Sequence, residues 1–188
     1  MKRLFIAIDF SEGEKEAVEG LKNKCFKEYP GVRWIPRGNL HFTLKFIGFV
    51  KGEKIKKIEE ALLKISREFK KFTLRVRRFR TFNREPFIVF LEIEKSKKLE
   101  QLAGKIEEET RRLGFPGENR SFNPHITLGR GKKLLPSEKK TLNEQAEKLI
   151  FKTPFNFEVK EITLMESNLK ATGAVYVPHS RFTFLNKK

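Results

Sequence analysis

Two copies of one four-residue frame carry side chains that could exchange protons. His41-Phe42-Thr43-Leu44 returns 84 residues later as His125-Ile126-Thr127-Leu128, so the frame holds two of the chain's three histidines. A histidine titrates near ~6.5 and can therefore donate or accept a proton close to neutrality. A pair of them predicts a reaction in which one proton is removed while another is delivered.

Cleavage of a phosphodiester is a reaction of this kind. In an in-line displacement at phosphorus the attacking and leaving oxygens lie on opposite sides, so the base and the acid must also come from opposite sides. The hydroxyls of Thr43 and Thr127 could hydrogen-bond the non-bridging oxygens between them. The repeat alone leaves open which histidine is the acid and which is the base.

Other chemistries fit the sequence less well. The chain has three histidines and one cysteine, without H-x-H, H-x-x-x-H or C-x-x-C spacing, so we expect no metal site. A G-x-S-x-G elbow, a P-loop and a G-x-G-x-x-G stretch are also missing. We therefore expect an enzyme that works without a cofactor.

The repeat extends to the elements that must position the frames. At the same offset each half shows strand, helix, motif strand, helix and strand in that order. Ser11 with Glu14 forms a capping box for the first helix, and Ser96 can cap its counterpart. The predicted strands cover 3–10, 40–50 and 72–80 in one half, and 87–94, 125–130 and 155–165 in the other.

This order predicts one bilobal α+β domain over residues 1–188. We expect a duplicated, pseudo-two-fold fold in which two antiparallel sheets line a central groove and the helices lie outside. The expected lobes are approximately 1–83 and 84–170. A C-terminal hairpin, 171–188, is expected from strands at 174–177 and 181–185.

Alternation along a strand predicts which side chains face the groove. In the first motif strand the wholly apolar set belongs against the helices, which leaves the histidine and threonine on the concave face. The groove set is His41, Thr43, Lys45 and Ile47, and the helix set is Leu40, Phe42, Leu44 and Phe46. His125 and Thr127 are expected to face them across the groove.

The charge indicates an anionic partner. Lys and Arg total 41 against 24 Asp and Glu, a net charge of +17, which favours RNA. The alternative is a solvated surface of the kind that thermophilic proteins carry. Arg75 and Arg77 share a face with Thr73 and would hold RNA phosphates if that face is the groove; otherwise they are solvated.

Four more residues are candidates for binding substrate. Arg130 follows the second frame, but its parity places it opposite His125 unless Gly129 introduces a bulge. Lys45 has the better parity. Trp34 and Tyr176 could stack on a base, although a place in the core is favoured for both.

The chain resembles the 2H phosphoesterase superfamily, and within it the RNA 2',3'-cyclic phosphodiesterases, also named 2'-5' RNA ligases. The resemblance rests on RLFIAIDF, WIPRGNLHFTLKFIG, NPHITLGR and both intact H-x-T-x motifs, and it covers essentially the whole chain. It implies metal-free hydrolysis of a terminal 2',3'-cyclic phosphate to a 2'-phosphate. It also implies His41 as proton donor, His125 as proton acceptor and an arginine at position 130.

The resemblance further implies partners and a reverse reaction. The expected partner is RNA with a 2',3'-cyclic phosphate end, tRNA fragments among them, and in the reverse ligation a 5'-hydroxyl replaces water. Two alternatives stay open: an RNA-binding module without catalysis, and a 2H enzyme for a small cyclic nucleotide. The single cysteine, Cys25, and the lack of a signal peptide predict a cytoplasmic protein.

Overall fold

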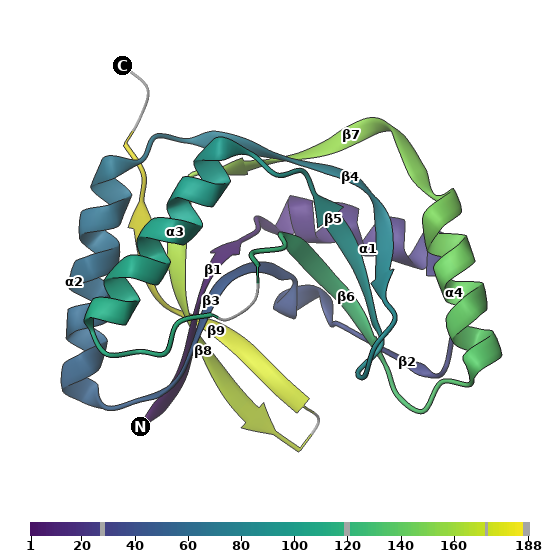
Figure 1. The fold of residues 1–188 in the computed structure, drawn as a ribbon, viewed down its shortest axis with the longest axis horizontal. Coiled ribbons are helices and arrows are strands. Elements are labelled where there is room, and N and C mark those ends of the chain that lie inside the picture. The colour runs from purple at the N-terminus through teal and green to yellow at the C-terminus, as the bar shows by residue number, and fades with distance from the viewer. Residues whose placement is uncertain (27–28, 119–120, 172, 186–188) are drawn as a thin grey trace.

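The protein folds into nine strands and four α-helices in the part of the chain that the computed structural model describes (Figure 1). That part is 1–26, 29–118, 121–171 and 173–185, without the side chains of 150–154. The strands are β1 (Lys2–Asp9), β2 (Val32–Trp34), β3 (His41–Val50), β4 (Phe72–Phe82), β5 (Ile88–Ile93), β6 (His125–Gly131), β7 (Ile150–Val159), β8 (Glu161–Lys170) and β9 (Gly173–Thr183). The helices are α1 (Glu12–Phe26), α2 (Gly52–Glu68), α3 (Lys97–Arg112) and α4 (Pro136–Lys148), with a 3₁₀ turn at Arg37–Asn39.

The strands form two sheets. The first sheet has the order β3-β1-β8-β9, the second has the order β2-β6-β5-β4-β7, and neighbouring strands in both run antiparallel. The motif strand β3 belongs to the first sheet and the motif strand β6 to the second. The predicted α+β class with two antiparallel sheets is confirmed.

The sheets divide the strands differently from the expected lobes. β4, the last strand of residues 1–83, lies in the second sheet beside β5, whereas β8, from the second half, lies in the first sheet beside β1. The closing strand of each half of the chain thus belongs to the sheet that contains the motif strand of the other half. A local hydrophobic pattern does not reveal such an exchange, because strand pairing is decided by contacts far apart in sequence.

The helices follow the same exchange. α1 leaves the first sheet and packs on the second, where Phe26 contacts Trp34 and Phe79 at ring distances of 5.8 and 5.0 Å. α3 leaves the second sheet and packs beside β3 and α2, so α2 and α3 stand together on one side of the molecule (Figure 1). We call the first sheet with α2 and α3 the first lobe, and the second sheet with α1 and α4 the second lobe.

Both predicted helix caps are present. The Ser11 backbone N–H donates to the Glu14 carboxylate (2.7 Å) and the Glu14 N–H to the Ser11 hydroxyl (3.3 Å), which completes the capping box. The Ser96 hydroxyl accepts from the backbone N–H of Leu99 (3.3 Å). Short polar side chains therefore set where α1 and α3 begin.

The C-terminal third corrects two predictions. The expected strand 155–165 is interrupted at Lys160, so that β7 ends in the second sheet and β8 begins in the first. The expected hairpin of 174–177 and 181–185 is wrong, because one long strand, β9, pairs with β8 along its length, from Gly173 opposite Lys170 to Thr183 opposite Glu161. Part of the predicted segment, residues 172 and 186–188, lies outside the described residues.

Candidate active site

Each motif strand carries an extra residue at the same place in its frame, and β3 carries a second one at Ile47. On β3 the pairing with β1 runs from Thr43 opposite Ala7 to Lys45 opposite Ile6, which leaves Leu44 without a partner. On β6 it runs from Thr127 opposite Phe90 to Gly129 opposite Val89, which leaves Leu128 without a partner. An extra residue of this kind inverts the alternation of all side chains that follow it.

The bulge on β3 overturns the predicted faces beyond Thr43. Lys45, expected in the groove, is 3 % exposed, and its ammonium contacts Glu107 of α3 (2.6 Å) and the carbonyl of Pro116 (2.9 Å). Ile47 is buried as well, whereas Phe46, expected in the core, is 61 % exposed and faces the groove. The prediction that Lys45 reaches the substrate is therefore wrong, because its ammonium is turned toward α3.

The bulge on β6 brings Arg130 to the groove. Arg130 pairs with Ile88 and lines the same cavity as His125 and Thr127. The condition set by the sequence is met, although the extra residue is Leu128 rather than Gly129. Phe46 and Arg130 occupy equivalent positions of the two frames, so the repeat places an aromatic ring on one wall and a guanidinium on the other.

Both histidine-threonine pairs line one cavity of about 400 Å³ between the lobes. His41 and Thr43 come from the first sheet, and His125, Thr127 and Arg130 from the second. The remaining walls are formed by Arg3, Leu4, Phe5, Ile35, Phe46, Gly48, Ile88, Ser167 and Tyr176. Two imidazoles from opposite sheets can thus act on one small group held between them.

Residues at the start of β3 and just before it fix the orientation of the His41 ring. Its Nδ1 lies 2.7 Å from the Asn39 carbonyl oxygen, and its Nε2 lies 3.0 Å from the Thr43 hydroxyl. A carbonyl oxygen only accepts, so Nδ1 carries the proton and Nε2 is the atom that exchanges protons with the cavity. Phe5 and Tyr176 enclose the ring at centroid distances of 4.9 and 5.1 Å.

Burial and two sets of charges act on His41. Burial lowers the pKa of the imidazole below its ordinary value, because the protonated form loses hydration. The hydrogen bond to Asn39 and the Asp9 carboxylate raise this pKa again. Lys15 and Arg130 lower it.

His125 repeats the geometry in different electrostatic surroundings. Its Nδ1 lies 2.8 Å from the Asn123 carbonyl oxygen, so Nε2 again faces the cavity. Burial lowers the pKa of His125, the bond to Asn123 raises it, and Arg130 and Arg84 both lower it. Phe82 and Phe90 pack edge-on against the ring, each at 5.3 Å.

The asparagines are site residues that the motif analysis missed. Asn39 and Asn123 stand two residues before the histidines at the same 84-residue offset, so the repeated frame is N-x-H-x-T-L. The Asn39 side chain also donates to the Ala174 carbonyl (2.7 Å) and accepts from the Tyr176 backbone N–H (3.0 Å). It thereby fixes β9 beside His41, and a longer comparison of the two halves would have found the pair.

The two aromatic candidates, Tyr176 and Trp34, lie in different parts of the structure. Tyr176 lies on the cavity wall against His41 and Phe5, where a base or ribose could contact it. Trp34 instead packs on the helix side of the second sheet, over Gly129, where an added Cβ would lie 2.6 Å from the indole ring. The prediction that Trp34 stacks on a base is wrong, because its ring fills the space that Gly129 leaves.

The predicted arginine pair lies away from the two cavities that His125 lines. Arg75 and Arg77 are exposed on β4, and Arg75 pairs with Asn156 of β7 at the far side of the sheet. The arginine of β4 that lies in line with His125 is Arg78. It pairs with Glu92, which itself pairs with His125, and it binds the Glu92 carboxylate at 2.7 Å. The structure therefore favours the solvated alternative for Arg75 and Arg77.

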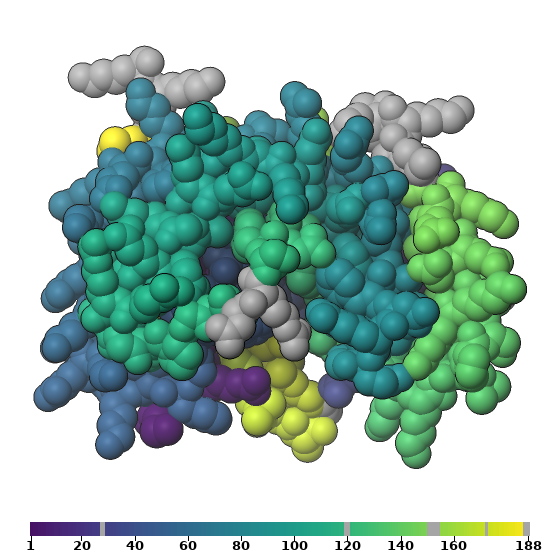
Figure 2. Space-filling view, in the orientation of Figure 1, coloured from purple at the N-terminus to yellow at the C-terminus, as the bar shows by residue number. Residues whose placement is uncertain are grey.

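A larger cavity of about 890 Å³ adjoins the first and shares Thr43, Phe46 and His125 with it. One wall is α3 with Glu100 and Glu107, and the other carries Phe82, Asn83 and Arg84 at the end of β4. Figure 2 shows this face of the molecule hollowed between the side that carries α3 and the side that carries the β4–β5 turn. The groove is thus long enough to continue past the histidine pair.

Two further observations concern metals and membranes. Among the residues that the structure describes, no three His, Cys, Asp or Glu side chains are grouped so that they could hold a metal ion. Within the same residues, no helix combines the length and the apolar character needed to cross a bilayer.

Comparison with known proteins points to one family. The model of the 2'-5' RNA ligase superfamily matches residues 11–171. RNA 2',3'-cyclic phosphodiesterases from Thermotoga maritima and Methanocaldococcus jannaschii are each 33% identical to the chain, covering 93% of it and 91% and 96% of their own lengths. The crystal structure of E. coli LigT complexed with 3'-AMP superposes with a TM-score of 0.80 at 28% identity, covering 97% of this chain and 98% of that one.

Proposed function

The chain belongs to the 2'-5' RNA ligase superfamily, and from that premise we propose that it hydrolyses the 2',3'-cyclic phosphate end of an RNA to a 2'-phosphate. The observation that carries the proposal is the single cavity lined by both histidine-threonine pairs and Arg130. This set provides two proton-transfer groups on opposite sides of a phosphate. It also provides a cation and two hydroxyls for the phosphate oxygens.

In the proposed step, water attacks phosphorus while His125 Nε2 takes one of its protons. The bond from phosphorus to the 3' oxygen breaks, and His41 Nε2–H protonates that oxygen as it leaves. The products are a 2'-phosphate and a 3'-hydroxyl. Exchange with solvent then returns a proton to His41 and removes one from His125, which restores both groups.

The charges around the two rings support these roles. Burial lowers the pKa of both rings, and cations lower it further, Lys15 and Arg130 at His41 and Arg130 and Arg84 at His125. A carboxylate, that of Asp9, opposes this at His41 by raising its pKa, and this difference has the direction that a general acid needs.

The substrate would lie across both cavities. Arg130, Thr43 and Thr127 would bind the non-bridging oxygens, because a guanidinium and hydroxyls are strong donors to a phosphate. The exposed ring of Phe46 and that of Tyr176 would contact the terminal nucleoside. The larger adjoining cavity favours an oligonucleotide over a free cyclic mononucleotide.

The first experiment is to incubate the purified protein, with EDTA present, with an oligoribonucleotide that ends in a 2',3'-cyclic phosphate. Phosphorus NMR then identifies the product. We expect a terminal 2'-phosphate. A 3'-phosphate would mean that the 2' oxygen leaves, and an unchanged end would favour RNA binding without catalysis or a different phosphoester.

The pH dependence of kcat/KM is expected to be bell-shaped. Its acid limb would report the loss of the proton from His125, and its basic limb the loss of the proton from His41. Because burial lowers the pKa of both rings, the profile should lie toward lower pH than two free histidines would give. A profile centred above the ordinary histidine range would contradict the assignment.

The same pair would also serve a ligation, in which a 5'-hydroxyl takes the place of water. That hydroxyl would give up its proton to His125 and attack phosphorus, the bond from phosphorus to the 3' oxygen would break, and His41 would protonate that oxygen, which leaves a 2'-5' linkage. Incubating a cyclic-phosphate oligonucleotide with a second one that carries a 5'-hydroxyl, followed by gel separation, tests this. A longer product that disappears in the His41→Ala variant would support it, and its absence would restrict the proposal to hydrolysis.

A further inference from the structure

Asp9 lies directly across the sheet from His41. The two residues are paired in the ladder between β1 and β3, so their side chains share the groove face of the first sheet. Cross-strand neighbours of this kind have Cβ atoms about 4.5–5.5 Å apart. The Asp9 side chain is only 5 % exposed, so its charge acts on His41 with little screening by water.

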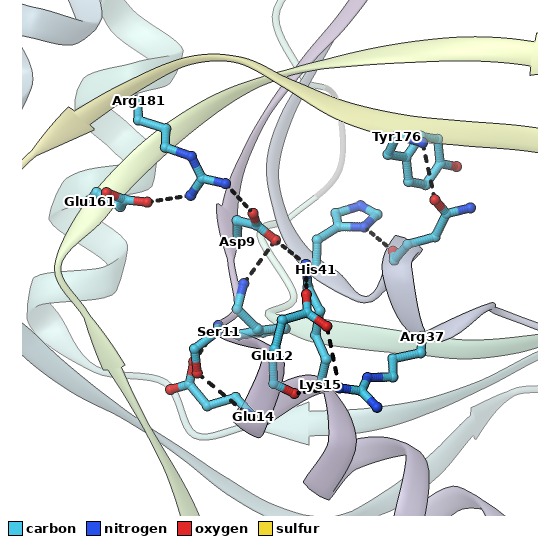
Figure 3. A network of polar contacts seen from close by, with 12 residues as sticks. Asp9, Ser11, Glu12, Glu14, Lys15, Arg37, His41, Glu161, Tyr176 and Arg181 are labelled. Carbon is cyan, nitrogen blue, oxygen red and sulfur yellow. Dashed lines mark hydrogen bonds and ion pairs between the residues drawn. The ribbon is translucent and has the colours of Figure 1, made fainter.

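Two cations from different elements bind the Asp9 carboxylate. Lys15 of α1 contacts Oδ1 at 3.0 Å, and Arg181 of β9 contacts Oδ2 at 2.9 Å (Figure 3). The backbone N–H of Phe10 donates to Oδ1 as well (3.0 Å), and Arg181 also binds Glu161 at 2.6 Å. These contacts hold the carboxylate in one orientation beside the histidine.

The second lobe does not repeat this arrangement. Glu92 is paired with His125 as Asp9 is with His41, but its carboxylate is bound by Arg78 at 2.7 Å. Glu92 is absent from the charges that act on the His125 pKa, whereas Asp9 raises the pKa of His41. Of two equivalent acidic residues, one thus acts on its histidine.

We propose that Asp9 is a positioning residue for the general acid: held by Lys15 and Arg181 across the ladder from His41, its carboxylate favours the protonated form of the imidazole. This inference rests on the proposed function. Asp9 does not line the catalytic cavity, so its effect must pass through His41.

The charged groups around His41 predict opposite effects for two substitutions. Asp9 raises its pKa, and Lys15 from α1 and Arg130 from β6 lower it. The outer charges bind one another, Arg37 to Glu12 at 3.3 Å and Arg181 to Glu161. Asp9→Asn should therefore lower the pKa of His41, and Lys15→Met should raise it.

The test is the pH profile of kcat/KM together with the NMR titration of the His41 ring proton. His41 must be protonated to act as an acid, so a lower pKa ends activity at lower pH. In Asp9→Asn we expect the basic limb and the NMR midpoint to move together to lower pH. In Lys15→Met both should move to higher pH.

Glu92→Gln is the matched control. It removes the equivalent carboxylate of the second lobe, and we expect the basic limb to stay in place. Thermal melts followed by circular dichroism show whether each variant is folded at the assay temperature. Should Asp9→Asn not fold, Lys15→Met and the wild-type NMR titration still test the direction.

Several outcomes would overturn the inference. They are an unmoved basic limb in Asp9→Asn, shifts of the same sign in Asp9→Asn and Lys15→Met, or an equal shift in Glu92→Gln. A wild-type protein without hydrolytic activity would instead overturn the proposed function. In that case the NMR titration alone would still decide whether Asp9 controls the protonation of His41.

Discussion

The two lobes begin from one six-residue frame and surround it differently. In both, an asparagine carbonyl binds histidine Nδ1, a threonine follows, and the strand bulges at the next leucine. Asp9, Lys15 and Tyr176 surround His41, Arg84 acts on His125, and Arg130 lowers the pKa of both rings. The repeated frame fixes where the proton-transfer atoms lie, and the neighbours that are not repeated distinguish the two histidines.

The residues after the bulges continue this contrast. Phe46 and Arg130 both face the groove, and the residues before them, Lys45 and Gly129, both face the helices. One position has thus become aromatic in one lobe and cationic in the other. A ring suits a base or a ribose and a guanidinium suits a phosphate, so we expect the substrate to bind in one orientation.

The largest expected effect comes from removing either histidine. His41→Ala and His125→Ala should each lower kcat for a cyclic phosphate end by about 10² or more, because one proton transfer is lost. Hydrolysis of bis(p-nitrophenyl) phosphate separates them, since nitrophenolate leaves without a proton. On this substrate, followed by absorbance, His41→Ala should keep far more activity than His125→Ala, and the reverse order would exchange the proposed roles.

The second comparison concerns the positions after the bulges. Arg130→Ala should lower kcat by about 10²-fold, as expected when a donor to a developing charge is removed. Phe46→Ala should mainly raise KM for an oligonucleotide, because base stacking is worth about 1–3 kcal/mol. Steady-state kinetics with Arg130→Lys and Phe46→Tyr as conservative controls tests the difference; equal effects on KM in both alanine variants would contradict it.

The asparagines should differ in stability. Asn39→Ala leaves the Ala174 carbonyl and the Tyr176 N–H without their partner, which should reduce the free energy of unfolding by about 1–3 kcal/mol. Asn123 is exposed on the wall of the larger cavity, so Asn123→Ala should change it by about 0.5 kcal/mol or less. Urea unfolding measures both, and similar losses in the two variants would show that Asn39 does not hold β9.

The smallest effect on catalysis is expected at Lys45. Lys45→Met removes the ion pair with Glu107 and should lower the melting temperature while leaving KM unchanged, because the ammonium faces α3. Phe46→Ala, its immediate neighbour on the strand, serves as the comparison. A higher KM for RNA in Lys45→Met would mean that the ammonium reaches the groove after all.

The sequence predicted those features that depend on local patterns. The Ser11 and Ser96 caps are set by a few neighbouring residues, and the strand-helix order by hydrophobic period, so both followed from the chain alone. The bulges at Leu44 and Leu128 could not be predicted in this way, because a leucine at this position is compatible both with a regular strand and with a bulge. The errors at Lys45 and Phe46 follow from the extra residue Leu44, and Ile47 is itself the extra residue of a second bulge on β3.

The strand exchange was hidden for a different reason. The closing strands have the same alternation whichever sheet they join, and only the pairing of β4 with β5 and of β8 with β1 decides between them. The position of Trp34 could not be predicted without the strand pairing either, since Gly129 lies beneath its ring only when β2 pairs with β6. Pairing between distant segments is therefore the information that a single sequence did not provide.

The exchange also sets the order in which the lobes are completed during synthesis. The last strand of the second lobe ends at Val159, but the first lobe needs β8 and β9 and is complete only when Thr183 has emerged from the ribosome. The lobe of His41, which is translated first, is thus the last to close. Until then β1 and β3 can pair with each other, but the other edge of β1 lacks β8, so this apolar strand must be kept from other nascent chains.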